Sequence, residues 1–214
     1  MKKVLILGLA STMEDAPAEY DGDIWTCNDG AIRRTQKYGK PYLTAMFDAH
    51  NLNVAEISEM QAAILCESFN IPIYDVQEYP WLRTSHRYPF EEVSDMIGFG
   101  LFSDVFCYMV AYAIYMKFDH IDIMGAHLHP LQRDHQESAI AHFWVGHAMG
   151  RGIAVNIMDY DNDNCALMKN GEYWTGPGAY GHWEPKANLL MEIEARRNPR
   201  QEPEHVIQVQ GADK

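Results

Sequence analysis

Short apolar runs bounded by turn residues alternate along this chain with longer segments of helical periodicity. The first run, Lys3 to Leu7, is nearly continuously apolar, as is typical of a strand buried on both faces of a parallel sheet. Runs of this kind predict strands over 3–7, 23–27, 42–47, 71–76, 120–124 and 153–158. The periodic segments predict helices over 31–38, 51–69, 105–117, 135–150 and 185–197. This alternation predicts an α/β fold, a single Rossmann-like domain with a mostly parallel sheet flanked by helices.

Other segments complete the predicted layout. Residues 77–100 contain prolines and several aromatic residues without clear periodicity, and we expect an irregular, lid-like loop there. Ser103 and Asp104 precede a strongly apolar segment and should cap the start of a central helix. We place the α/β domain at 1–197 and expect residues 198–214 to form a polar, flexible tail.

The charge balance narrows the classes of partner. The formal net charge of -13 disfavours a broad nucleic-acid surface, because such a surface needs clustered Lys and Arg to neutralise phosphates. It is compatible with a small-molecule nucleotide ligand held in one local pocket. No apolar run approaches the ~20 residues that span a bilayer, so we expect no membrane insertion. The sequence leaves a homo-oligomer open.

Cysteine usage bears on the redox compartment. The chain has 4 cysteines, widely spaced and without a C-x-x-C motif. Its first residues lack the long apolar core and small-residue cleavage site of a secretion signal. We therefore expect reduced thiols and a cytoplasmic protein. The cysteines are Cys27, Cys66, Cys107 and Cys165.

Small or polar residues follow three predicted strands at the point where each strand ends. The first strand leads into Gly8-Leu9-Ala10-Ser11-Thr12, the second into Asn28-Asp29 and the third into Asp48-Ala49-His50. Small residues let backbone N–H groups approach a phosphate, although each segment alone also fits an ordinary turn. In an open α/β sheet, ligands bind beyond the carboxyl ends of the strands. The sequence therefore favours one shared pocket at this edge of the sheet.

The strand over 120–124 ends at Gly125, and a cluster of imidazole, carboxylate and amide side chains follows at once. Such side chains suit zinc or another divalent ion. A histidine also suits acid–base catalysis, because it titrates near neutral pH. A solvated polar loop is the third interpretation, and we favour acid–base or substrate contact over metal binding. The members of the cluster are His127, His129, Asp134, His135 and Gln136.

Aromatic residues and glycines alternate near residue 180. Trp174, Tyr180 and Trp183 could form a wall on which a base or a sugar ring stacks, and core packing explains them equally well. We keep Tyr180 as a candidate substrate contact.

Several short motifs together resemble a known family. They are the opening run Lys2-Lys3-Val4-Leu5-Ile6-Leu7-Gly8, the strand end Trp25-Thr26-Cys27-Asn28, and a helix that begins at Ser103 and leads into the strand ending at Gly125. This layout resembles the bacterial sialyltransferases that use CMP-sialic acid. Those enzymes have a Gly-x-Gly-Pro-Ser first loop, an Arg-Cys-Asn strand end and a Thr-Ser-Gly helix start. Here the first loop reads Gly-Leu-Ala-Ser, and the helix start reads Phe102-Ser103-Asp104.

The chain also resembles uncharacterised phage-encoded proteins of the same layout. In those we expect a Gly-Val-Asp-Met strand end, a Tyr-x-Tyr-Gln-Arg-Pro loop and a late Gly-x-Tyr-Gly-Tyr motif. The matching places here are 125–128, 133–138 and 178–182. The resemblance to the sialyltransferases implies that Ser11, Asn28 and Ser103 hold a cytidine nucleotide. It also implies a catalytic histidine on a lid-like segment, for which His86, His135 and His182 are the candidates.

These observations predict a nucleotide-dependent, glycosyltransferase-like transferase that uses a nucleotide sugar or a related diphosphate. We expect His127 or His135 to be the catalytic base, assisted by Asp134. The predicted nucleotide contacts are Gly8, Ser11, Thr12, Asn28, Asp29, Ser103 and Gly125. The predicted substrate contacts are Asp48, His50, His129, Gln136 and Tyr180.

Two alternatives remain open. The first is a pyrophosphokinase or phosphohydrolase that uses Asp48 and the histidine cluster with a divalent metal. The second is a non-catalytic phage protein that binds or sequesters a nucleotide. The sequence assigns no certain cofactor; it predicts a nucleotide or nucleotide sugar as the ligand and leaves a divalent metal open.

Overall fold

The computed structural model describes residues 1–53, 56–97, 100–126, 135–158, 168–169 and 172–173. The chain divides into two compact units, Met1–Tyr173 and Trp174–Lys214. The second unit lies outside the described residues. The helix expected over 185–197, the tail from residue 198 and the single-domain boundary at 197 therefore stay predictions.

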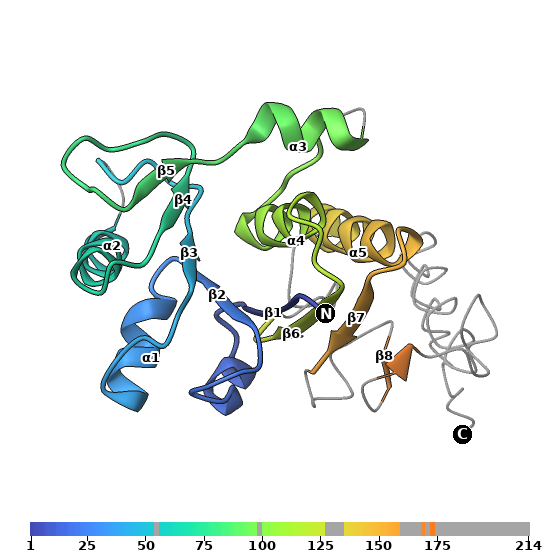
Figure 1. Cartoon of the computed structure of the whole chain (residues 1–214), viewed down its shortest axis with the longest axis horizontal. Helices are drawn as coiled ribbons and strands as arrows, with labels where there is room; N and C mark the ends of the chain where they lie inside the picture. Colours follow the sequence, from blue (N-terminus) through green and yellow to red (C-terminus); the bar gives the residue numbers. More distant parts are fainter. Residues whose placement is uncertain (54–55, 98–99, 127–134, 159–167, 170–171, 174–214) are drawn as a thin grey trace, which may run out of the picture. The chain divides into compact units, whose positions relative to one another are not determined.

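A seven-stranded parallel sheet forms the centre of the first unit (Figure 1). Its strand order is β5-β4-β3-β2-β1-β6-β7. The strands are β1 (Lys3–Leu7), β2 (Asp23–Cys27), β3 (Ala45–Phe47), β4 (Ile73–Asp75), β5 (Ser85–Arg87), β6 (His120–Met124) and β7 (Ala154–Ile157). The α/β class with a parallel sheet, predicted from the apolar runs, is confirmed.

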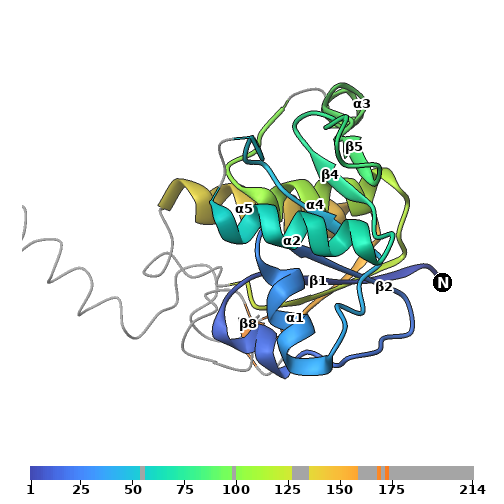
Figure 2. The ribbon, with the colours of Figure 1, turned by 90° about the vertical axis from the view of Figure 1, so that its left-hand side faces the viewer.

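Helices cover both faces of this sheet, because alternate strand residues point to opposite sides. On one face, Val4 and Ile6 of β1 pack with α4 (Val105–Tyr115) and α5 (His135–Gly150). On the other face, Leu5 and Leu7 pack against the 3-10 helix Ser11–Asp15. Further along that face lie α1 (Gly30–Tyr38) and α2 (Ile57–Ser68), which pack on β3 and β4. Figure 2 shows α4 and α5 above β1 and α1 below it.

The helix α4 is apolar on nearly every side and buried over most of its length, as its sequence predicts. Its start is also as predicted: Asp104 is the N-cap residue, and its Oδ1 accepts a hydrogen bond from the backbone N–H of Cys107 at 3.0 Å. Capping in this way satisfies one of the free N–H groups at the first turn. No helix among the described residues is long and apolar enough to cross a membrane.

The prediction of an irregular loop over 77–100 was wrong for part of that segment. It contains β5 and the helix α3 (Phe90–Ile97). The strand β5 reads Ser-His-Arg and lies at the edge of the sheet, so it lacks the apolar run that marks a buried strand. Tyr88 follows it and is buried in the core with Phe90 packed against it.

Two predicted elements are shorter than their sequence patterns. The helix predicted from residue 51 begins only at Ile57, because Glu56 and Glu59 form a capping box at the helix start. The strand predicted from residue 42 begins at Ala45, since Tyr42 has a positive φ of 48° that an extended strand does not allow. A short antiparallel pair, β8 (Met168–Lys169) and β9 (Glu172–Tyr173), was not predicted.

The strand order sets the position of a crevice. From β1 the chain builds the sheet in one direction through β2, β3, β4 and β5, and then returns to add β6 and β7 on the other side. The connection after β1 therefore continues on one face of the sheet, and the connection after β6 continues on the other. Such a reversal opens a ligand-binding crevice outside the carboxyl ends of the strands.

Candidate functional site

The loops after β1 and β6 meet at the reversal point and are joined by backbone hydrogen bonds. The N–H of Gly8 donates to the carbonyl of Met124 at 2.8 Å, and the N–H of Ala10 donates to the carbonyl of Gly125 at 2.9 Å. The N–H of Gly125 donates to Oγ1 of Thr12 at 3.1 Å. The chain can pass this closely because Gly8 and Gly125 lack side chains; a Cβ at Gly8 would lie 2.2 Å from the Gly125 oxygen.

A cavity of about 620 Å³ lies beside this crossing. Its walls come from the ends of β1, β2, β3 and β6 and from the starts of α4 and α5. The predicted site residues that line it are Gly8, Asn28, His50, Ser103 and Gly125. The volume falls within the ~300–1,000 Å³ that small-molecule sites occupy. Four strand ends and two helix starts thus converge on one space large enough for a nucleotide.

Asn28 lies on the wall at the end of β2. Its φ of 47° is in the left-handed region, which asparagine tolerates better than most residues. Its backbone N–H donates to the carbonyl of Phe47 at 3.2 Å and so ties the ends of β2 and β3 together. Its side-chain Oδ1 is buried and accepts no hydrogen bond from the described residues. A buried amide oxygen without a donor, on a cavity wall, is suited to contact a ligand.

The start of α4 supplies another part of the wall. Ser103 and Asp104 lie there with the rings of Phe102 and Tyr108. These two rings stack with their centroids 4.7 Å apart and their planes 13° from parallel. They give the cavity an aromatic side next to a polar helix start. Such a wall can pack against a flat ring, as is common in sites that bury a base.

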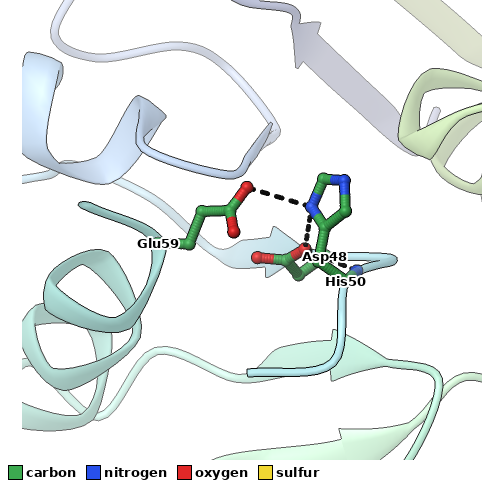
Figure 3. A group of neighbouring side chains, drawn as sticks. All are labelled: Asp48, His50 and Glu59. Carbon is green, nitrogen blue, oxygen red and sulfur yellow. Dashed lines mark hydrogen bonds and ion pairs between the residues drawn. The ribbon is translucent and has the colours of Figure 1, made fainter. Parts of the chain in front are cut away.

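A second polar group, formed by Asp48, His50 and Glu59, lies where β3 ends (Figure 3). The Nδ1 atom of His50 is 3.0 Å from Oδ1 of Asp48 and 3.0 Å from Oε1 of Glu59. The Asp48 side chain is completely buried, whereas 52% of the His50 side chain is exposed. Burial raises the pKa of the Asp48 carboxyl, and the N–H groups of His50 and Ala49 oppose that rise.

Behind this group lies a further buried carboxyl, Asp75, at the end of β4. Burial raises its pKa to about 7, and the neighbouring charge of Asp48 adds to the rise. Hydrogen bonds from the Val76 N–H and the Tyr79 side chain oppose it. Two acidic groups therefore share a poorly solvated region behind the cavity rim.

The other predicted site residues fall into two groups, those that the structure describes and those that it does not. Thr12 lies behind the wall and holds Gly125, and the Asp29 carboxylate pairs with Nε of Arg33 at 3.1 Å. Asp48 is buried behind His50. The roles assigned to the remaining residues stay predictions, because His127, His129, Asp134 and Tyr180 lie outside the described residues, as do the side chains of Ser11, His135 and Gln136.

Sequence reasoning missed several residues of this region. Glu59 belongs to α2 and approaches His50 only in the folded chain. Tyr108 and Glu137 line the cavity from the first turns of α4 and α5, where the sequence pattern predicts a helix but marks no site residue. The charged residues among the described lining are Asp104 and Glu137, with neither Lys nor Arg in that part of the wall.

Comparison with known proteins shows that solved structures share this fold. No family model matches the sequence, and no curated protein matches it significantly. The structure is similar to the sialyltransferase CstII from Campylobacter jejuni solved in complex with cytidine-5'-monophosphate, with a TM-score of 0.50 and 17% identity over 79% of this chain and 86% of that chain. It is also similar to an alpha-2,3-sialyltransferase from Campylobacter jejuni in apo form, with a TM-score of 0.50 and 12% identity over 92% of this chain and 95% of that chain. At these identities the likeness concerns the fold alone. The chain has the fold of bacterial sialyltransferases, as the resemblance of its short motifs implies.

Proposed function

We propose that this protein is a glycosyltransferase-like enzyme that transfers a sugar from a nucleotide donor held in the cavity. The observation that carries the proposal is the convergence of Gly8, Asn28, Ser103 and Gly125 on one cavity at the strand-order reversal. The family resemblance associates Asn28 and Ser103 with the nucleotide, and the strand-end pattern adds Gly8 and Gly125. A neighbour of the same fold was solved with cytidine-5'-monophosphate, which makes a cytidine nucleotide the first ligand to test.

The proposed reaction is a displacement at the anomeric carbon of the donor sugar. An acceptor hydroxyl forms a new bond to that carbon, the bond from the carbon to the phosphate oxygen breaks, and the nucleotide leaves with the bonding electrons. A base takes the hydroxyl proton, and we assign this role to His127 or His135 with Asp134 assisting. Backbone N–H groups at the start of α4 would stabilise the departing phosphate.

The proposal is tested first by binding. Isothermal titration calorimetry with CMP, UDP, GDP and ADP should show one of them binding to one site. Asn28→Gly should weaken this binding at least about tenfold, because it removes the amide that faces the cavity. Its stability should change little, since glycine accepts the positive φ. Absence of binding by all four nucleotides would remove the basis of the proposal.

The chain offers a matched control for this variant. Asn70 also has a positive φ, 56°, but lies just beyond the end of α2 and outside the cavity lining. Asn70→Gly makes the same chemical change in the same backbone region. It should leave the nucleotide affinity within about twofold, and an equal loss in both variants would contradict a direct role for Asn28.

The assignment of the base is tested by turnover. His127→Gln and His135→Gln should each be assayed for sugar transfer and for nucleotide affinity. Loss of the base should lower kcat by about 10²–10⁴-fold while nucleotide affinity is retained. Recovery of the donor unchanged under all conditions would favour the sequestering alternative. Hydrolysis without transfer to any acceptor would favour the phosphohydrolase.

A further inference from the structure

We propose that Asp48, His50 and Glu59 form a binding site for a divalent transition-metal ion, with zinc as the best-matched probe. The site lies at the end of β3, where His50 also lines the cavity. Two carboxylates and one imidazole are a mixed oxygen and nitrogen donor set that suits zinc better than magnesium or calcium. This inference does not depend on the proposed transferase function, because the three side chains make the site without a nucleotide.

The separations between the donor atoms fit such an ion. One donor atom from each of the three residues lies within 4.8 Å of the others, and His50 Nδ1 is 3.0 Å from both carboxylates. Zinc bonds to nitrogen and oxygen of about 2.0–2.2 Å place neighbouring tetrahedral ligands about 3.4 Å apart. The side chains therefore need to separate only slightly to admit the ion. A water or substrate atom would take the fourth position.

The carboxylate of Asp48 provides an independent sign that the cluster binds a cation. Its side chain is completely buried, and its Oδ2 has no hydrogen-bond partner among the described residues. In Figure 3 this oxygen points toward Glu59, into the cluster. Nδ1 of His50 carries one hydrogen at most and already faces Oδ1 of Asp48 and Oε1 of Glu59, so it cannot also serve Oδ2. Leaving a buried carboxylate oxygen unpaired is costly, and a cation would satisfy it.

In a second histidine–carboxylate pair, His120 and Asp122, both carboxylate oxygens have hydrogen-bond partners. Nε2 of His120 lies 2.9 Å from Oδ1 of Asp122. Asn156 also donates to that Oδ1 at 3.0 Å, and the Tyr20 hydroxyl donates to Oδ2 at 2.5 Å. Both oxygens of Asp122 therefore have partners within the protein. The contrast separates a pair that stabilises the fold from a cluster whose buried oxygen still needs a ligand.

The donor atoms of the proposed site are held by a second set of contacts. The backbone N–H of His50 donates to Oδ1 of Asp48 at 2.9 Å, which fixes the turn that brings the two side chains together. The backbone N–H of Glu56 donates to Oε2 of Glu59 at 3.2 Å within the capping box of α2. Oε1 of Glu59 is thereby left directed at His50 (Figure 3). Such outer contacts orient metal ligands and raise affinity.

The test is a zinc titration of nucleotide-free protein by calorimetry. Since His127, His129 and His135 could bind zinc by themselves, the parent protein carries His127→Gln, His129→Gln and His135→Gln together. This parent should bind one zinc ion with micromolar or tighter affinity. Asp48→Asn, His50→Gln and Glu59→Gln should each weaken zinc binding at least about tenfold. Thermal unfolding of each variant, with and without zinc, shows whether it is folded; zinc should raise the Tm of the parent more than that of any of the three ligand variants.

His120→Gln is the matched control, because it removes a histidine from the fully partnered pair. It should leave zinc affinity within about twofold. Absence of zinc binding by the parent would overturn the proposal. Equal affinity in the parent and the three ligand variants would also overturn it, as would an equal loss in His120→Gln. If Asp48→Asn fails to fold because Asp48 is buried, His50→Gln still tests the proposal, because His50 is exposed.

Discussion

Gly8 and Gly125 lie in direct backbone contact although 117 positions separate them in the sequence; a Cβ built on Gly8 would be 2.2 Å from the Gly125 carbonyl oxygen. Gly125 has a φ of 69°, and a Cβ there would be 2.8 Å from the Gly8 oxygen. The contact holds the loops after β1 and β6 together at the floor of the cavity. Neither position accepts a side chain without a shift of the backbone.

We therefore predict that Gly8→Ala destabilises the protein and distorts the cavity. The new methyl group must displace the Gly125 backbone, and overpacking of this kind costs about 1–3 kcal/mol. Urea unfolding measures the loss. Gly146→Ala is the control, because a Cβ at that helical glycine meets nothing within 4 Å. It should raise stability by about 0.5–1 kcal/mol. Equal effects of the two substitutions would contradict the proposed contact.

The buried carboxyl of Asp75 predicts a pH-dependent stability. Its pKa of about 7 in the folded protein lies above the ordinary value of 3.8, so between these values the folded state holds a proton that the unfolded state releases. Stability is therefore lost as the pH rises through this window. Asp75→Asn removes the effect. In chelator-containing buffer, the stability of Asp75→Asn relative to wild type should rise by about 1–3 kcal/mol from pH 5 to pH 8.

Carbon NMR of the Asp75 carboxyl group checks the cause directly. Its signal should titrate near pH 7 in the folded protein. A stability difference that stays constant across the same pH range, or a carboxyl that titrates near its ordinary value, would show that this group is not the source.

The buried guanidinium of Arg34 predicts a large cost for a conservative change. Its Nε donates to the carbonyl of Pro41 at 2.9 Å, and its Nη2 donates to Pro17 at 2.9 Å and to Ala18 at 3.1 Å. A lysine ammonium cannot reproduce this planar fork. Arg34→Lys should therefore lower the free energy of unfolding by about 2–3 kcal/mol.

Arg87→Lys provides the comparison in the same unfolding assay. Arg87 is exposed and pairs with Glu91 on the surface of the edge strand. Exposed ion pairs contribute little, so the stability should change by less than about 0.5 kcal/mol. A loss as large as that of Arg34→Lys would show that burial of the Arg34 side chain is not what makes it sensitive.

Two of the described cysteines, Cys66 and Cys107, should resist modification in the folded state. Cys27, Cys66 and Cys107 are buried, and burial raises the pKa of the Cys66 and Cys107 thiols to about 12. Few thiolates exist under such conditions, and the thiolate is the reactive form. In a Cys27→Ser, Cys165→Ser background, a disulfide reagent at about pH 8 should react with Cys66 and Cys107 only as fast as the protein opens. Cys27 is replaced because it also lines the cavity. Rapid reaction of one thiol in native protein would contradict its burial.

Much of the fold could be predicted from the sequence because its signals are local. The continuous apolar runs mark β1, β2 and β6 within one residue, and the apolar segment after Asp104 marks α4. The edge strand β5 escaped prediction because a strand with one open side needs no apolar run. The late start of α2 was not predicted, because the helical periodicity of the sequence begins before residue 57. The capping box of Glu56 and Glu59 sets the actual start of the helix.

The candidate site, like the fold, could be predicted from the sequence only in part. By itself, the sequence determined that Gly8, Asn28, His50 and Gly125 follow strands, because strand ends are marked by nearby turn residues. Only the tertiary structure decided which strands are neighbours, and so which of these residues share a cavity. It also decided that Glu59 meets His50 and Asp48, because the contact depends on how α2 packs beside β3. Local pattern specifies an element, whereas the meeting of distant side chains is specified by packing of the whole core.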